Sequence, residues 1–284
     1  RKLARLVTWV TGTSSAPPRA TFMAVSLTGQ ARSRGRMSPL IPKQAAVSFT
    51  CQGREYTVAG TAKGSGMIAP RMATLLAFLV TDAPVDRENL DKIFRAAVNK
   101  TLNSITIDGD TSTNDTAIIL SPCTGKYIQD NESLAAFTGA LEAVLMKLAE
   151  MLVLDGEGAT KSVKIHVINA ATDDDAMLIA RSVGQSLLVK TAFFGNDPNW
   201  GRIACAAGYS GAALEEEKLS ISIDNIPLLV RGVPADADYS VLGKILKNRK
   251  YTVTVDMGLG QGDAIMLTTD ISYDYVKINA QYST

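Results

Sequence analysis

The chain has 284 residues, of which 46% are hydrophobic and 20% are charged, and its formal net charge is +1. This composition is typical of a folded globular protein with one broad domain or two lobes, and no apolar run approaches the roughly 18 residues of a membrane span. One histidine, His166, and three scattered cysteines (Cys51, Cys123 and Cys205) form no recognisable zinc-binding pattern and favour reduced thiols in the cytoplasm.

The charge is unevenly distributed along the chain. Residues 1–43 carry eight basic residues and no acidic one, whereas the remainder carries 21 basic against 28 acidic residues. Nothing in this distribution indicates a nucleic-acid surface. Residues 1–41 show no sustained helix or strand period, and they are rich in Arg and Ser, a composition typical of transit peptides.

Regular patterning begins near residue 44. Alternating side chains over residues 44–51, a Gln52-Gly53 turn and a second alternating stretch over residues 55–59 predict a β-hairpin. The next segment has Gly-Ser-Gly at 64–66, a proline at position 70 and then Met-Ala-Thr at 72–74. Residues 75–80 are continuously apolar, which predicts a short strand buried on both faces, with Thr74 at its start.

Two helices and an acidic loop are predicted next. Asp86 precedes a helix whose apolar residues recur every 3.6 residues up to Leu102. The polar loop 108–115 leads into a strand over 116–120; it could bind a cation, but a solvated turn is the favoured interpretation. A second helix, over about 133–153, has a continuous apolar stripe that core packing explains. It ends at Asp-Gly-Glu-Gly-Ala-Thr-Lys, residues 155–161. Taken by itself, this stretch is interpreted as an ordinary helix C-terminus with exposed charges.

The second half repeats the alternation of strands and helices. A strand surrounds His166, and a helix follows Asp173-Asp174-Asp175 and reaches Leu187. Gly-Leu-Gly-Gln-Gly-Asp at 258–263 is similar to a dinucleotide-binding fingerprint, but it precedes a strand instead of a helix, so we interpret it as a hairpin loop. The remaining predicted elements are strands near 219–223, 227–230, 251–255 and 264–271, and a helix near 239–247.

Thr74 is presented in a way that suggests a nucleophile, but a threonine hydroxyl needs a base. His166 lies in an alternating stretch and is interpreted as an outward-facing strand residue, which argues against a Ser-His-Asp arrangement. A threonine can instead use its own α-amine, once the peptide bond before it has been cut. That amine titrates at about 7.7–8.0, so it can accept a proton near neutral pH.

Four motifs carry a resemblance to a known family. Lys-Gly-Ser-Gly-Met-Ile-Ala-Pro at 63–70 followed by Met-Ala-Thr at 72–74 is similar to the self-cleavage site of the arginine-biosynthesis bifunctional proteins, the ornithine acetyltransferases. The stretches 155–161, 196–202 and 279–284 also resemble motifs of that family, in the same order. The resemblance begins abruptly near residue 42, so we interpret residues 1–41 as a truncated or altered, poorly ordered segment.

The resemblance implies an α/β fold, a layered mixed-sheet fold of the self-processing ornithine acetyltransferase type. It implies cleavage between Ala73 and Thr74, so that residues 42–73 end an alpha chain and residues 74–284 form a beta chain. We expect two lobes in the latter, at about 74–160 and 161–284. The family further implies a heterotetramer of two alpha and two beta chains in the cytoplasm.

The implied activity is acetyl transfer from N2-acetylornithine to glutamate, with Thr74 as the nucleophile that carries the acetyl group. The substrate contacts carried over are Lys63, Thr74, Glu157, Asn279 and Thr284. No metal or cofactor is expected, and acetyl-CoA is a co-substrate of only some members. The family's oxyanion-hole Thr-Gly pair lies upstream of the matching region, so no residues of this chain are assigned to it.

Two alternatives stay open. A self-processing aminopeptidase or amidase would pass the acyl group to water instead of glutamate, although Glu157 and the chain-end residues argue against it. The chain could also be an inactive fragment or a binding module, because its first 41 residues do not match the family. In each case we expect small-molecule ligands, no nucleic acid and no membrane.

Overall fold

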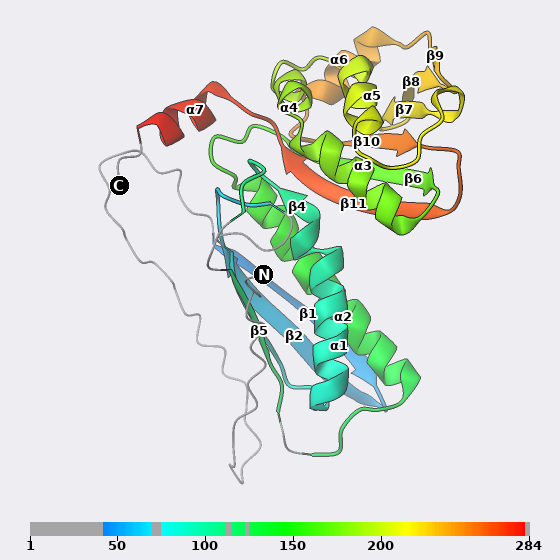
Figure 1. The fold of residues 1–284 in the computed structure, drawn as a ribbon. Coiled ribbons are helices and arrows are strands. Elements are labelled where there is room, and N and C mark those ends of the chain that lie inside the picture. The colour runs from blue at the N-terminus through cyan, green and yellow to red at the C-terminus, as the bar shows by residue number, and fades with distance from the viewer. Residues whose placement is uncertain (1–41, 70–74, 112–114, 123–124, 282–284) are drawn as a thin grey trace. The chain divides into compact units, whose positions relative to one another are not determined.

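The computed structural model describes residues 42–69, 75–111, 115–122 and 125–281 (Figure 1). These residues form two compact units, and the chain alternates between them along the sequence. Unit 1 takes the described residues within 42–63, 75–101 and 115–148, and unit 2 takes those within 64–69, 102–111 and 149–281. The predicted lobes of the beta chain, 74–160 and 161–284, stay a prediction.

Unit 1 contains a four-stranded sheet in the order β1-β2-β3-β5. Its strands are β1 (Lys43–Cys51), β2 (Arg54–Lys63), β3 (Leu76–Thr81) and β5 (Thr116–Leu120). β1 and β2 form the predicted antiparallel hairpin, and β3 runs antiparallel to β2 and parallel to β5. The turn residues Gln52 and Gly53 have φ values of 49° and 72°, because a two-residue hairpin turn of this kind needs positive φ at both positions.

Two helices complete unit 1, α1 (Arg87–Lys100) and the first part of α2 (Asn131–Leu154). Asp86 caps α1 as predicted, since its carboxylate accepts hydrogen bonds from the amides of Glu88 and Asn89. α2 packs on the sheet, and the ring of Phe137 lies 6.0 Å from the ring of Phe49 on β1. The core of this unit therefore lies between α2 and one face of the sheet.

The prediction that residues 75–80 are buried on both faces is wrong. Ala77 and Leu79 of β3 are fully buried, but Leu76, Phe78 and Val80 are 36–40% exposed. Successive side chains of a strand point to opposite faces, and the described helix α2 covers only the face that carries Leu79. The continuous apolar run thus combines a core face with an apolar face that no described element of unit 1 covers.

Unit 2 contains a seven-stranded sheet in the order β4-β11-β6-β10-β7-β8-β9. β10 runs parallel to β6, whereas β11 runs antiparallel to it on the other side. The strands are β4 (Ile105–Thr106), β6 (Ser162–Ala170), β7 (Ser220–Ile223), β8 (Ile226–Val230), β9 (Val233–Pro234), β10 (Lys250–Asp256) and β11 (Gly262–Thr269). With its helices, this sheet makes the chain a mixed α/β protein, as predicted.

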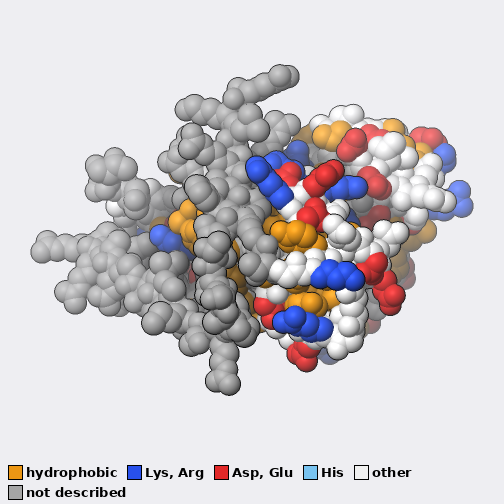
Figure 2. All heavy atoms as spheres, turned by 90° about the horizontal axis from the view of Figure 1, so that it is seen from below, with side chains coloured by type: hydrophobic (Ala, Val, Ile, Leu, Met, Phe, Trp, Pro, Cys, Tyr) orange, Lys and Arg blue, Asp and Glu red, His pale blue; other side chains and the backbone are white. Residues whose placement is uncertain are grey.

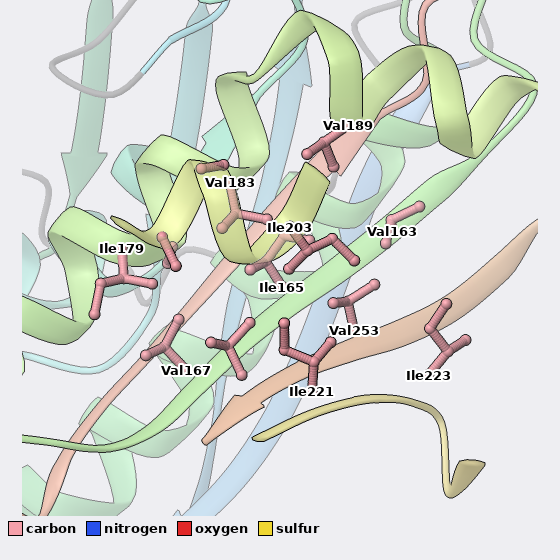
Figure 3. Packing of buried hydrophobic residues seen from close by; sticks show 14 of the residues in the cluster. Val163, Ile165, Val167, Ile179, Val183, Val189, Ile203, Ile221, Ile223 and Val253 are labelled. Atoms are coloured by element: carbon pink, nitrogen blue, oxygen red, sulfur yellow. The ribbon is translucent and has the colours of Figure 1, made fainter. Parts of the chain in front are cut away.

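Five helices lie wholly within the described part of unit 2, and all of them except the last contribute buried residues to its core. They are α3 (Asp173–Gln185), α4 (Leu187–Phe194), α5 (Trp200–Gly208), α6 (Tyr239–Lys247) and α7 (Tyr273–Ala280), with short 3-10 turns at Leu102–Ser104 and Glu216–Lys218. Figure 3 shows Ile165 and Val167 of β6 facing Ile179 and Val183 of α3, all fully buried. Period-two alternation on the strand and 3.6-residue periodicity on the helix bring these apolar faces together.

Two details of this unit differ from the predictions. Residues 258–263 do not form a hairpin loop, because β10 and β11 pair with β6 on opposite sides and the loop crosses the end of β6. A side chain at Gly260 would lie 2.6 Å from the carbonyl oxygen of Ala170, which explains the glycine. The helix predicted to reach Leu187 ends at Gln185, because Ser186 caps a new helix there.

The surface carries charges of both signs. Figure 2 shows basic and acidic side chains interspersed with apolar ones on the face in view, not gathered by sign. Among the described residues, no helix combines the length and apolar character that crossing a membrane requires. Cys51 and Cys205 are both free thiols.

Candidate active site

The predicted cleavage site, Ala73 and Thr74, lies outside the described residues, as does Thr284. Leu75, which follows Thr74, belongs to unit 1, and its backbone N–H and carbonyl each form a hydrogen bond there. Its N–H donates to Asp115 Oδ1 at 2.9 Å, and its carbonyl accepts from the N–H of Thr116 at 2.9 Å. Burial raises the pKa of Asp115, and the hydrogen bond from Leu75 partly offsets that rise.

Lys63 is an exposed residue at the end of β2. In the pairing of β2 with β3 its Cα lies opposite that of Leu76, two residues after Thr74. The sheet register of unit 1 therefore brings Lys63 beside the strand that Thr74 precedes. Its role in substrate binding stays a prediction.

Residues 64–69, before the cleavage site, are held in unit 2 by the carboxylate of Asp108 and by backbone hydrogen bonds. Asp108 accepts hydrogen bonds from the amides of Met67 at 2.6 Å and Ile68 at 3.1 Å. The carbonyl of Ile68 accepts in turn from the amide of Ile107 at 2.8 Å. The start of the acidic loop, which the sequence suggested as a solvated turn, therefore holds this segment in place.

Glu157 stands on the turn that follows α2 and lies against the same segment. Its backbone N–H donates to the carbonyl of Ser65 at 2.7 Å. A side chain added at Gly66 would lie 2.6 Å from Glu157 Oε2, closer than real Cβ contacts allow. The glycine in the Gly-Ser-Gly motif thus leaves room for the Glu157 carboxylate over the backbone of residue 66.

The turn also contacts α7, which carries Asn279. Ser272 caps this helix by accepting from the amide of Tyr275 at 3.2 Å, and its hydroxyl donates to the carbonyl of Gly158 at 2.6 Å. Asn279 Nδ2 donates to Glu157 Oε2 at 3.3 Å and to the carbonyl of Tyr275 at 3.0 Å. The structure therefore brings together Glu157 and Asn279, two predicted substrate contacts that are 122 residues apart.

Tyr275 lies among the acidic residues of this site. Its pKa is raised to about 12, mainly by burial and further by the charges of Asp108, Asp110 and Glu157, and by a hydrogen bond to Asp108. It is therefore a neutral phenol at physiological pH. Among the described residues these three carboxylates form no ion pair. A ligand with an ammonium group would find here the negative charge that it needs.

His166 does not belong to this site. Its Nε2 lies 2.7 Å from Asp263 Oδ2, in a partly exposed pair on the surface of the sheet, which agrees with the outward orientation predicted for it. No cluster of three or more potential metal-ligating side chains occurs in the part of the chain that the structure describes.

Sequence reasoning missed Asp108, Asp115 and Tyr275 as individual residues of the site. Asp108 and Asp115 bound the predicted acidic loop, and only the fold shows that each accepts a backbone N–H flanking the cleavage segment. A signal for Tyr275 did exist, because it precedes Asn279 by four residues and therefore shares one face of a helix with it.

Comparisons with known proteins test the resemblance. The model of the ArgJ family matches residues 37–284. The chain belongs to the ArgJ family. The family resemblance and the fold class predicted from the sequence are thereby confirmed, with the family match starting five residues before the predicted limit at residue 42.

Similar proteins come from bacteria, archaea and fungi. The arginine biosynthesis bifunctional protein ArgJ of Geobacter sulfurreducens is 50% identical over 247 residues, 86% of this chain and 63% of that protein. A glutamate N-acetyltransferase of Methanocaldococcus jannaschii is 43% identical over 253 residues, again 86% of this chain and 63% of that protein. The chain thus spans less than two thirds of the length of these relatives.

A solved structure supports the fold. The crystal structure of the arginine biosynthesis bifunctional protein ArgJ from Bacillus halodurans aligns with a TM-score of 0.69 and 37% sequence identity. The alignment covers 72% of this chain and 98% of that chain. At this identity and score, the mixed α/β architecture is shared by the two proteins.

Proposed function

We propose that this chain transfers an acetyl group from N2-acetylornithine to glutamate, giving ornithine and N-acetylglutamate. The observation that carries the proposal is the hydrogen-bonded Glu157–Asn279 pair, in which Glu157 lies against the backbone of residues 64–66 in the cleavage motif. Its carboxylate suits an ammonium group of ornithine, while the amide of Asn279 orients it. The printed names of the relatives, ArgJ and glutamate N-acetyltransferase, support the same reaction.

In the proposed mechanism, cleavage before Thr74 frees its α-amine to act as the base. The Thr74 hydroxyl attacks the acetamide carbonyl and gives up its proton to that amine. The carbon–nitrogen bond then breaks, and the proton passes to the departing nitrogen of ornithine. Finally the amine of glutamate attacks the acetyl-threonine ester, the ester carbon–oxygen bond breaks, and the proton lost by the glutamate amine passes by way of the Thr74 α-amine to the threonine oxygen, which regenerates the hydroxyl.

The remaining predicted contacts have supporting roles in this scheme. The Lys63 ammonium suits a substrate carboxylate or developing negative charge, and Thr284 would supply an orienting hydrogen bond. The lengths of the compared chains support cleavage, because 98% of the Bacillus halodurans chain aligns with 72% of this one. A chain of that length is about as long as residues 74–284. We further propose a heterotetramer of two alpha and two beta chains, a cytoplasmic location, and acetyl-CoA as an optional second acetyl donor.

The test is formation of N-acetylglutamate from N2-acetylornithine and glutamate, followed by mass spectrometry. Transfer that is lost on removing glutamate supports the proposal, and release of free acetate in its place would identify the alternative amidase. Glu157→Gln keeps the size of the side chain and removes its charge. We expect it to reduce kcat/KM by about 10- to 100-fold, because hydrogen bonds to charged groups contribute about 1.5–3 kcal/mol. Equal activity of this variant would contradict the role of Glu157.

A further inference from the structure

A buried lysine that is not part of the site described above contacts the strand end to which the segments of that site are attached. Lys190 of α4 is 1% exposed, yet its ammonium forms no ion pair among the described residues. Its Nζ donates to Thr268 Oγ1 at 3.1 Å, to Thr269 Oγ1 at 3.0 Å and to the carbonyl of Thr269. Its three protons therefore all go to the end of β11.

Thr269 and the residues after it form hydrogen bonds to the segments that carry the candidate site. Residues 268–272 are called the anchor segment below. Thr269 Oγ1 donates at 3.1 Å to the carbonyl of Ile107, next to Asp108. Asp270, 3% exposed, accepts from the amides of Thr160 and Lys161, both at 2.9 Å, and so closes the turn that carries Glu157.

The third segment is attached through Ser272. Its hydroxyl joins the Glu157 turn to the start of α7, which carries Asn279. The three segments 105–111, 155–161 and 273–280 thus each bond to the anchor segment, although they are far apart in the sequence. Asp270 also accepts from the hydroxyl of Thr160, and β4 pairs with β11 at Thr268. The position of each segment therefore depends on the geometry of the anchor segment.

An ammonium group fixes that geometry in a way that an apolar side chain cannot. It has only donors, so each threonine hydroxyl that accepts from it must send its own proton elsewhere. Thr268 donates to the carbonyl of Gly184 at 2.7 Å, and Thr269 donates to that of Ile107. Burial lowers the pKa of Lys190 to about 7, opposed by the charges of Asp270 and Asp108, so the ammonium form is present at neutral pH and below.

We propose that Lys190 is a positioning residue of the candidate site: through Thr268 and Thr269 it sets the anchor segment, and thereby the places of Asp108, Glu157 and Asn279. The inference rests on the proposed function only in taking these residues as the site. The alternative is that Lys190 contributes to the general stability of α4 without any specific effect on the three segments.

Amide hydrogen exchange of the full chain, followed by mass spectrometry, separates the two. We expect Lys190→Met to raise exchange about tenfold or more in residues 105–111, 155–161 and 273–280. Val189→Ala is the matched control, because Val189 is a fully buried neighbour on α4 that packs in the apolar core of unit 2. This control should raise exchange around α3, α4 and α5 while leaving the three segments unchanged. Equal patterns in the two variants would overturn the proposal.

Two further variants keep the test decisive if Lys190→Met does not fold. Thr269→Val should loosen residues 105–111 alone, and Asp270→Asn should loosen residues 155–161 alone. If both variants raised amide exchange evenly over unit 2, the proposed role of the anchor segment would be contradicted. Binding of N2-acetylornithine by calorimetry adds a functional readout, with affinity reduced in Lys190→Met and retained in Val189→Ala. Absence of binding to the wild-type chain would count against the proposed function, whereas the exchange results would still decide the role of Lys190.

Discussion

The two units position the predicted substrate contacts that each of them carries by different means. In unit 1 the position of Lys63 follows from the pairing of β2 with β3, which extends over six residue pairs. In unit 2 the positions of residues 64–69, Glu157 and Asn279 depend on a few side chains, chiefly Asp108, Asp270 and Ser272. The comparison teaches that single substitutions should disturb the site far more easily in unit 2 than in unit 1.

The largest effect is expected at the connection between the two regions. Ala69, the last described residue before the predicted cleavage site, belongs to unit 2, and Leu75 after that site belongs to unit 1. We predict that the chain cleaves itself before Thr74 and that Thr74→Ala abolishes both cleavage and acetyl transfer. Thr74→Ser should retain part of each, because serine keeps the hydroxyl. Intact-mass measurement should find a fragment of 211 residues from Thr74 to Thr284, and an uncleaved chain that transfers acetyl groups would refute the terminal-amine mechanism.

A pair of glycine substitutions compares the two units directly. Gly66→Ala should weaken binding of N2-acetylornithine about tenfold or more, since the added methyl would collide with the Glu157 carboxylate. Gly139→Ala, on α2 within unit 1, places its methyl in open space and should stabilise the helix by up to about 1 kcal/mol. Calorimetric titration and thermal unfolding measure the two effects. Unchanged affinity in Gly66→Ala would show that the carboxylate does not need its observed position.

Stability should depend on pH through unit 2. The pKa of Lys190 is lowered to about 7 in the folded chain from the ordinary value of 10.5, while the unfolded chain keeps the ordinary value. Between these values the unfolded chain binds the additional proton, so the free energy of unfolding should rise as the pH increases from 7 to about 10. Urea unfolding at several pH values should show this rise in the wild type, and Lys190→Met should remove it. An identical slope in that variant would assign the effect to other groups.

The smallest effect on stability is expected on the open face of the unit 1 sheet. Phe78 is 40% exposed on β3, so Phe78→Thr should change the free energy of unfolding by about 0.5 kcal/mol or less. The same change should reduce aggregation, because it interrupts the apolar face formed with Leu76, Val80 and Leu120. Light scattering at increasing protein concentration provides the measurement. A large loss of stability would mean that this face is covered in the folded protein.

Sequence patterns predicted the elements of this fold better than their surroundings. The hairpin of β1 and β2 could be predicted because its alternation and its Gln-Gly turn are local properties. The exposed face of β3 and the path of residues 258–263 across β6 could not, because they depend on which distant element packs or pairs nearby. Ser186 gives a local signal, but its capping of α4 is hard to distinguish within a continuous helical pattern.

In the candidate site, too, local sequence signals predicted some residues, whereas contacts between distant segments could not be predicted. The resemblance indicated Glu157 and Asn279, and the structure places them within hydrogen-bonding distance. Asp108, Asp270 and Lys190 carry no local signature, since each acts on residues that are 40 to 110 positions away. Their roles could be found only from three-dimensional contacts.

The interleaving of the two units has a mechanical consequence. In chain order the backbone passes from one unit to the other five times, and the passage that includes the predicted cleavage site is one of these. Cutting it would leave four covalent links, one of them the continuous helix α2. The units would stay covalently connected through these four links, so the break would free the amine of Thr74 without separating the two units.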